Sequence, residues 1–234
     1  MKTIAVALVL AAGFAFGAPA QAAMAIFDDL PALPAPDAGT GLLYANNSSL
    51  DYAGVTWDDR FTVTGDQYRV DTRTPGPLFG IPHSGHYFVS NGSASNDGLL
   101  ITTPLLLTGA WFGRNEYYGF GGGSDQITIH AMRGTNVLGS VVFNLPELRA
   151  SGPASHPGEP ELLEFVDTAS FATLTGITGY RIDRHEIGTL AGNWVADDFT
   201  FAAAAPVPEP GTWAMLLAGL GLVVRTLRRV KPHA

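Results

Sequence analysis

Cysteine is absent from the 234 residues of the chain, so no disulfide bond can hold its fold. Lysine is almost as scarce, because every basic residue apart from Lys2 and Lys231 is an arginine. Between Lys2 and Arg225, eight arginines stand against 21 acidic residues, which gives this segment a net charge of −13. Such a surface repels nucleic acid, which we exclude as a partner, and it favours cations or neutral ligands.

Apolar runs long enough to span a membrane comfortably are also missing. The first apolar stretch, Ile4–Gly17, has about 14 residues, short of the roughly 20 that a spanning helix needs. It follows the positive charge of Lys2 and precedes Ala20–Ala22, where small residues occupy the two positions that signal peptidase reads. We therefore expect residues 1–22 to form the helix of a cleavable signal peptide. A retained anchor, or cleavage after Ala25, is the alternative.

The second apolar stretch begins at Trp213 and ends at Val224, and a basic cluster at 225–231 follows it. Basic residues stay in the cytoplasm, so a transmembrane helix at 213–224 would hold the preceding domain outside. Two prolines keep the backbone extended in the segment before the helix. That segment consists of Val207, Pro208, Glu209, Pro210, Gly211, Thr212 and Trp213. We expect residues 204–234 to form a tail separate from the domain.

The order of short motif, apolar helix and basic cluster resembles the PEP-CTERM sorting domain. The resemblance rests on the motif at 207–213 and covers about residues 206–229. It implies that an exosortase, a membrane-embedded processing enzyme of Gram-negative bacteria that make exopolysaccharide, cuts near this motif. It also implies that the chain crosses the inner membrane and ends at the cell surface or outside the cell. An ordinary single-pass anchor is the alternative.

Helical periodicity is lacking between the two ends, whereas glycine and proline are frequent. Turn residues separate segments that alternate with a period of two or are continuously apolar: 99–103, 105–112, 126–133, 136–145, 180–185 and 195–201. Short strands with such punctuation are typical of sandwiches and jelly rolls. We expect residues 23–203 to form one all-β domain, a single antiparallel β-sandwich of the jelly-roll type.

The opening segment Ile26–Leu30 and the closing strand Trp194–Phe201 give this domain a looser resemblance to the β-sandwich domains of many PEP-CTERM proteins. Those domains are similar in outline to galactose-binding-like jelly rolls and carbohydrate-binding modules. The resemblance implies a structural calcium ion shared by acidic residues near the first strand and on the last strand. The matching residues here are Asp28, Asp29, Asp197 and Asp198.

Strand alternation bears on one of these acids. If Val195, Phe199 and Phe201 face the core, Asp197 shares their face. A buried carboxylate is costly unless it is paired, hydrogen-bonded or bound to a metal. Calcium would satisfy it, and a turn cap or an ion pair with Arg181 is the alternative.

No grouping of residues indicates an enzyme. His83 and His86 have a spacing that could bind a metal, but no third ligand is nearby, so a solvated turn is favoured. Surface ion pairs on alternate strand faces explain Asp183–Glu186, and an acidic loop explains the glutamates at 159–164 better than glycosidase carboxylates do. We predict no catalytic residues, and a secreted glycan-active hydrolase is the rival interpretation.

Aromatic residues gather between Trp111 and Phe120, interleaved with side chains that can bond to hydroxyl groups. Aromatic faces stack on sugars, so this composition favours carbohydrate binding. The candidate residues are Trp111, Arg114, Tyr117 and Tyr118. We expect an exported protein of the cell surface or biofilm matrix that contacts polysaccharide. A purely structural matrix protein, with these aromatics in its core, is the alternative.

Replacement of Pro208, Glu209 and Pro210 by alanine should leave an unprocessed precursor in the membrane. The reason is that the extended segment just outside the helix would be lost. The intact mass of the protein recovered from its host measures this. Release of the triple variant at the normal mature mass would contradict processing by an exosortase.

Overall fold

The computed structural model describes residues 22–31, 41–42, 49–68, 80–91, 98–114, 124–146, 162–185, 193–203 and 217–220. The chain divides into two compact units, Met1–Ala203 and Ala204–Ala234. In the second unit residues 217–220 are helical, and the rest of the predicted helix at 213–224 lies outside the described residues. Among the described residues, no helix has the length and apolar character to cross a membrane. The signal peptide also lies almost wholly outside them and stays a prediction.

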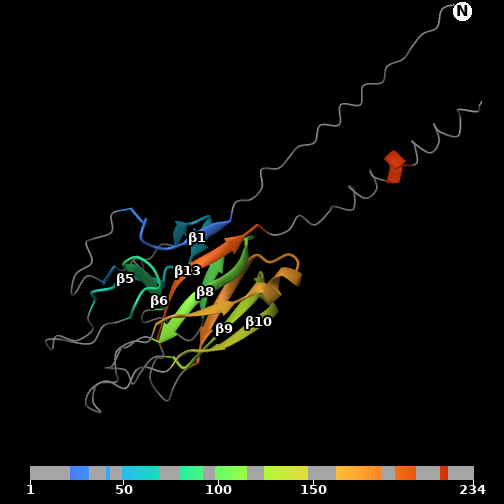
Figure 1. Cartoon of the computed structure of the whole chain (residues 1–234). Helices are drawn as coiled ribbons and strands as arrows, with labels where there is room; N and C mark the ends of the chain where they lie inside the picture. The colour runs from blue at the N-terminus through green and yellow to red at the C-terminus, as the bar shows by residue number, and fades with distance from the viewer. Residues whose placement is uncertain are drawn as a thin grey trace, which may run out of the picture. The chain divides into compact units, whose positions relative to one another are not determined.

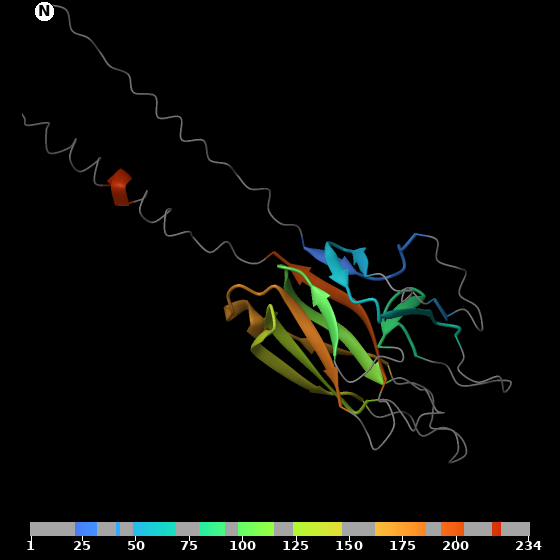
Figure 2. The same ribbon diagram turned by 180° about the vertical axis from the view of Figure 1, so that it is seen from behind.

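The first unit is a sandwich of two antiparallel sheets, as the alternating segments predicted (Figures 1 and 2). Sheet A has the order β11 (Glu164–Asp167), β8 (Leu106–Arg114), β13 (Trp194–Ala202), β6 (Tyr87–Ser90), β5 (Thr62–Gly65), β2 (Gly41–Leu42), and β1 (Ala23–Ala25) also pairs with β13. Sheet B has the order β10 (Asn136–Asn144), β9 (Gln126–Arg133), β12 (Gly179–Arg184), β7 (Leu99–Thr102), β4 (Val55–Trp57), β3 (Leu50–Tyr52). A short 3₁₀ helix, η2 (Ala169–Thr173), follows β11.

Alternation places the apolar side chains between the sheets. In β9, Ile127, Ile129 and Ala131 are fully buried, while the residues between them are less so. The aromatic side of the core surrounds Trp57, whose ring lies 5.2 Å from that of Phe27 and 5.0 Å from that of Phe199. These contacts are edge-on, an arrangement that aromatic rings favour. A core of this kind replaces the disulfides that the chain lacks.

A buried hydroxyl also links the two sheets. Tyr180 of β12 in sheet B accepts a hydrogen bond from Leu107 N at 2.8 Å and donates one to Leu105 O at 2.9 Å. Leu107 belongs to β8 of sheet A. The tyrosine therefore satisfies backbone groups of the opposite sheet that burial would otherwise leave unpaired.

The first and last strands lie side by side. β13 has β8 on one side, and on its other side β6 and β1 pair with successive parts of it. The pairing Ala23↔Phe201 to Ala25↔Phe199 brings the start of the domain against its end. The segments carrying the four predicted acids are consequently brought to neighbouring positions.

Candidate functional site

An irregularity in β13 sets the positions of Asp197 and Asp198. The register with β8 shifts between Asp197 and Thr200, and Asp198 has a φ of 49°. Before the shift, Ala196 faces the main core and Val195 faces a smaller cluster with Phe88 and Leu163. An extra residue at the shift is a β-bulge, and it reverses the alternation for the rest of the strand.

The bulge corrects one expectation from the sequence. Phe199 and Phe201 do face the main core, but Val195 does not. Asp197 pairs across the sheet with Trp111, which also packs against the smaller cluster. Asp197 is therefore on the outer side of sheet A, although it is fully buried. The prediction that it shares the face of Phe199 was wrong, because period-two counting does not register an inserted residue.

A loop 114 residues earlier in the chain covers Asp197. We call residues His83–His86 the histidine loop. The N–H groups of His83 and Ser84 each donate to Asp197 Oδ2 at 3.0 Å, and the N–H of Asp198 donates to Oδ1 at 2.8 Å. Three backbone donors thus serve a carboxylate that has no contact with solvent, which offsets the cost of its burial.

Asp198 holds the side chains of the same loop. Its Oδ2 lies 2.6 Å from His83 Nδ1, and its Oδ1 accepts a hydrogen bond from Ser84 Oγ at 2.9 Å. The Asp198 side chain is 8% exposed and that of His83 is 35% exposed. Asp198 is therefore nearly buried whereas His83 is partly exposed, and the imidazole lies between the buried acids and the surface.

Asp28 reaches the histidine loop from the first strand. Its Oδ1 accepts a hydrogen bond from His86 N at 2.7 Å, while its buried Oδ2 has no hydrogen-bond partner. Gly85, between the two histidines, has a φ of +57°, and a Cβ there would lie 2.0 Å from Asp28 Oδ2. His86 Nδ1 in turn lies 2.9 Å from Asp66 Oδ2. Asp28, Asp66, Asp197 and Asp198 therefore surround one four-residue loop.

Asp29 takes a different role from the other predicted acids. It accepts a short hydrogen bond from the hydroxyl of Tyr52, which itself accepts bonds from Ile26 N and Phe27 N. Burial and the neighbouring carboxylate raise the pKa of Tyr52. The side chain thus fixes the bend after β1, where Phe27 has a φ of 60°.

Hydrogen bonds from the protein compete with calcium for the predicted acids. Among the residues that the structure describes, no group of three or more His, Asp or Glu side chains is disposed to hold a metal ion. Protein donors are directed at both oxygens of Asp197 and of Asp198. Asp28 Oδ2 and, in the neighbouring acid Asp66, Oδ1 are buried without a hydrogen-bond partner. The convergence of the first and last strands is as expected, whereas calcium binding stays a prediction from the sequence.

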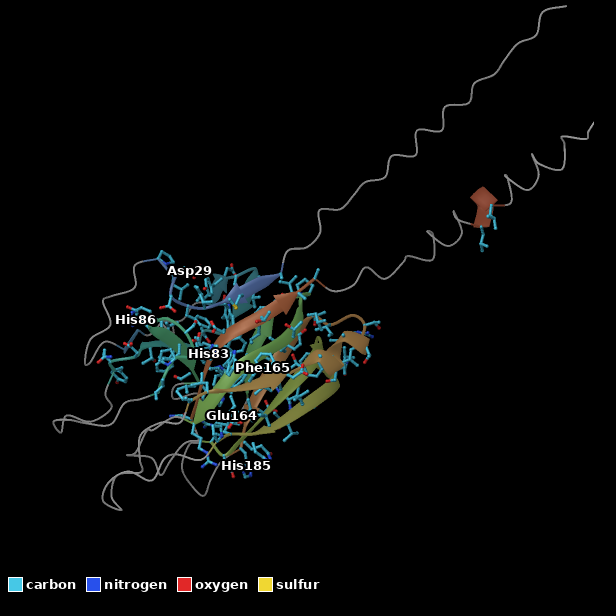
Figure 3. The ribbon with its side chains drawn as sticks, viewed as in Figure 1. Asp29, His83, His86, Glu164, Phe165 and His185 are labelled. Atoms are coloured by element: carbon cyan, nitrogen blue, oxygen red, sulfur yellow. The ribbon has the colours of Figure 1, made fainter. Side chains whose placement is uncertain are left out.

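An aromatic row lies beside the loop on the outer side of sheet A. The His83 ring stacks on Trp111 with 3.6 Å between centroids and 11° between planes. The Phe165 ring also contacts Trp111, with 5.5 Å between ring centroids and 60° between planes. Phe165 is 45% exposed and lies over Gly109, where a Cβ would be 2.2 Å from its ring. Figure 3 labels Phe165 and His83. We call His83, Trp111 and Phe165 the aromatic row.

The structure separates the predicted carbohydrate-binding residues. Trp111 lies in the aromatic row, but Arg114 pairs with the core residue Trp194 and donates to Leu145 O at 3.4 Å. Three positions apart on one strand, Trp111 and Arg114 point to opposite faces. Tyr117 and Tyr118 lie outside the described residues. Sequence reasoning missed Phe165 and His83, which join the row only through strand pairing and loop closure.

Gly85→Ala should lower stability more than Gly134→Ala. Both glycines have a φ of +57°, but a Cβ at Gly134 meets nothing within 4 Å, whereas one at Gly85 meets Asp28. Gly134→Ala adds only backbone strain, about 1 kcal/mol, and Gly85→Ala should cost about 1–3 kcal/mol more through displacement of the loop. Denaturant unfolding of both variants measures the difference. Equal losses of stability in the two variants would show that the close contact between Gly85 and Asp28 does not stabilise the fold.

The unfolding free energy should fall as pH rises from about 5 to 8.5. Burial raises the pKa of Asp197 to about 8, although the hydrogen bonds from the three N–H donors act to lower it. Burial also raises the pKa of Asp28. The hydrogen bond to Asp66 raises the pKa of His86. A carboxyl raised above its unfolded value near 4 loses stability as pH climbs toward the folded value, because only the unfolded chain has then released its proton. The raised histidine acts in the same direction, since its contribution is complete below about 6.5 and is lost through its folded pKa.

Denaturant midpoints across this pH range check the profile. Asp197→Asn removes the largest titrating contribution, so its profile should be flatter even though its absolute stability is lower. A wild-type profile that is flat, or that rises with pH, would contradict the prediction.

Comparison with known proteins adds a sorting signal and two distant folds. The PEP-CTERM protein-sorting motif matches residues 206–230. No curated protein matches the chain. The chain is similar to the crystal structure of the K2 cleaved adhesin domain of Lys-gingipain, with 18% identity, a TM-score of 0.36, and coverage of 78% of this chain and 99% of that chain. It is also similar to the K3 cleaved adhesin domain of Lys-gingipain from Porphyromonas gingivalis w83, with 13% identity, a TM-score of 0.28, and coverage of 79% and 93%.

At such TM-scores the two adhesin domains carry no argument about function. The sorting motif does, because it is the substrate signal of an exosortase. The chain carries a PEP-CTERM protein-sorting motif, and the protein is exported through the inner membrane to the cell surface or the extracellular space.

Proposed function

We propose that the sandwich is a non-enzymatic domain of the cell surface or extracellular matrix, and that it binds polysaccharide on the outer side of sheet A. The observation that carries this proposal is the aromatic row. Phe165 exposes 45% of its surface directly beside Trp111, on the outer side of sheet A. A large exposed aromatic next to a second one is a common feature of binding surfaces.

The chemistry around the row suits a neutral glycan. The net charge of −13 between Lys2 and Arg225 disfavours acidic polymers. Phe165 offers an apolar ring, and the partly exposed imidazole of His83 lies on the far side of Trp111. Sugar rings combine apolar C–H faces with hydroxyl groups, so an aromatic ring beside a hydrogen-bonding imidazole complements both. Tyr117 and Tyr118 follow β8 in the chain and stay candidates for the same surface.

The hydrolase interpretation has less support. Two carboxylates that act as acid and base must be able to exchange protons with substrate and water. Asp197 and Asp198 are instead held by donors of the histidine loop and are nearly inaccessible. A positioning role for these acids, under the aromatic row, accounts for their contacts. A structural matrix protein without a ligand is the remaining alternative.

Phe165→Ala should weaken retention on host exopolysaccharide by about two- to tenfold. This range corresponds to about 0.5–1.5 kcal/mol for one stacked ring. Leu100→Ala is the matched control, because Leu100 is 46% exposed on β7 of the other sheet. The circular dichroism of both variants should match the wild type. Equal retention of the two variants, or no retention of the wild type, would favour the structural-matrix alternative.

A further inference from the structure

The edges of the two sheets are protected unequally. In the described part of the chain, three of the four strands that end the two sheets are short: β2 has 2 residues, β3 has 3 and β11 has 4. β3 contains Asp51, and β11 contains Glu164 and Asp167. Short length and charge are the usual means by which proteins prevent edge strands from pairing with other chains.

β10 has neither protection. It is an end strand of sheet B with 9 residues, Asn136–Asn144, and no charged residue or proline. It lies at the outer margin of the sandwich in both views (Figures 1 and 2). β9 occupies one of its sides, and no strand of the described part of the chain pairs with the other. Alternate N–H and C=O groups of β10 therefore face outward from the sheet.

One irregularity lies near the hairpin end of this strand. The register shifts between Val137 and Gly139, and pairing with β9 then continues without interruption from Gly139↔Ala131 to Asn144↔Gln126. A bulge can blunt an edge, but this one leaves six consecutive residues regular. Within them Val142 is 59% exposed on the outer face.

We propose that β10 is a self-association edge, through which two copies of the chain pair antiparallel about a two-fold axis. The strand has the chemical symmetry that such a pairing requires. Within the regular part of the strand, the residues on either side of Val142 match in class: Val141 and Phe143 are apolar, and Ser140 and Asn144 are polar and uncharged. In an isologous contact each residue meets the counterpart related by the axis. Antiparallel pairing about Val142 sets Val142 against Val142, Val141 against Phe143 and Ser140 against Asn144.

Charge favours a second copy over other occupants. Two copies with net charge −13 each repel one another over most of their surface, and β10 is a long edge where no carboxylate opposes the approach. A basic peptide would find no acidic side chain on the strand to recognise. The one arginine at the start of the hairpin, Arg133, already donates to Gly176 O and Thr175 O.

The packing at this edge is also incomplete in a single copy. Val141 and Phe143 pack against the main core but are only partly buried. A partner strand 4.7–4.9 Å away would cover their open sides and continue both the sheet and its inner apolar layer. The new contact would thus add backbone hydrogen bonds and apolar burial together, as strand addition does in other proteins.

Cross-linking tests the pairing, because the chain contains no cysteine of its own. The mature protein recovered from its host would carry Val142→Cys, with Leu100→Cys as the control. Both sites are exposed on the outer face of sheet B, but Leu100 belongs to the interior strand β7. Under mild oxidation Val142→Cys should form a disulfide dimer at least tenfold faster than Leu100→Cys.

Sedimentation equilibrium gives a second readout. The wild type should show a concentration-dependent dimer, and Val142→Lys should be monomeric, because the two-fold axis brings the added charges together. Leu100→Lys should still dimerise. A monomeric wild type at all concentrations, equal cross-linking of the two cysteine variants, or a dimer that persists in Val142→Lys would each overturn the proposal. Loss of polysaccharide retention plays no part in these readouts, so the two proposals can fail separately.

Discussion

The buried carboxylate of Asp197 is the constraint around which one end of this sandwich is organised. A carboxyl group without solvent contact needs hydrogen-bond partners, and here the donors are backbone N–H groups of Asp198 and of a loop more than a hundred residues earlier. The bulge in β13 turns the strand so that Asp197 and Asp198 both address this loop. Gly85 lets the loop approach Asp28 closely enough to be held from the first strand as well.

The same constraint shapes the outer surface. Because the histidine loop is held over Asp197, the His83 ring lies flat on Trp111, which pairs with Asp197 across the sheet. Trp111 is then shielded on one face, and Phe165 becomes the exposed member of the aromatic row. A binding surface of this kind would be rigid, since each ring rests on a strand or on a loop fixed by charge-assisted hydrogen bonds. Rigid aromatic anchors lose little entropy when a ligand binds.

The sequence was most informative where interactions are local and least informative where they are not. Alternation correctly predicted β9 and β12, because each side chain's face follows from its neighbours. Period-two counting failed at Asp198, where a bulge depends on which face must bury Phe199 and Phe201. His83 and Ser84 gave no local sign that they serve Asp197. A turn after proline was expected there, and its partners lie 113 and 114 residues away in the chain.

Charge distribution connects the fold to the setting of the protein. The segment between Lys2 and Arg225 has a net charge of −13, so domains in a crowded layer would repel one another. Acidic residues also lie on the short edge strands β3 and β11. Contacts between uncharged groups are not opposed by this repulsion. A neutral glycan at the aromatic row and a second β10 strand at the sheet edge are contacts of this kind. The two surfaces lie on different sheets, one on sheet A and the other at the edge of sheet B. Occupying one need not block the other, and a sorted protein with both would link polymer chains through pairs of sandwiches, a property that neither contact has alone.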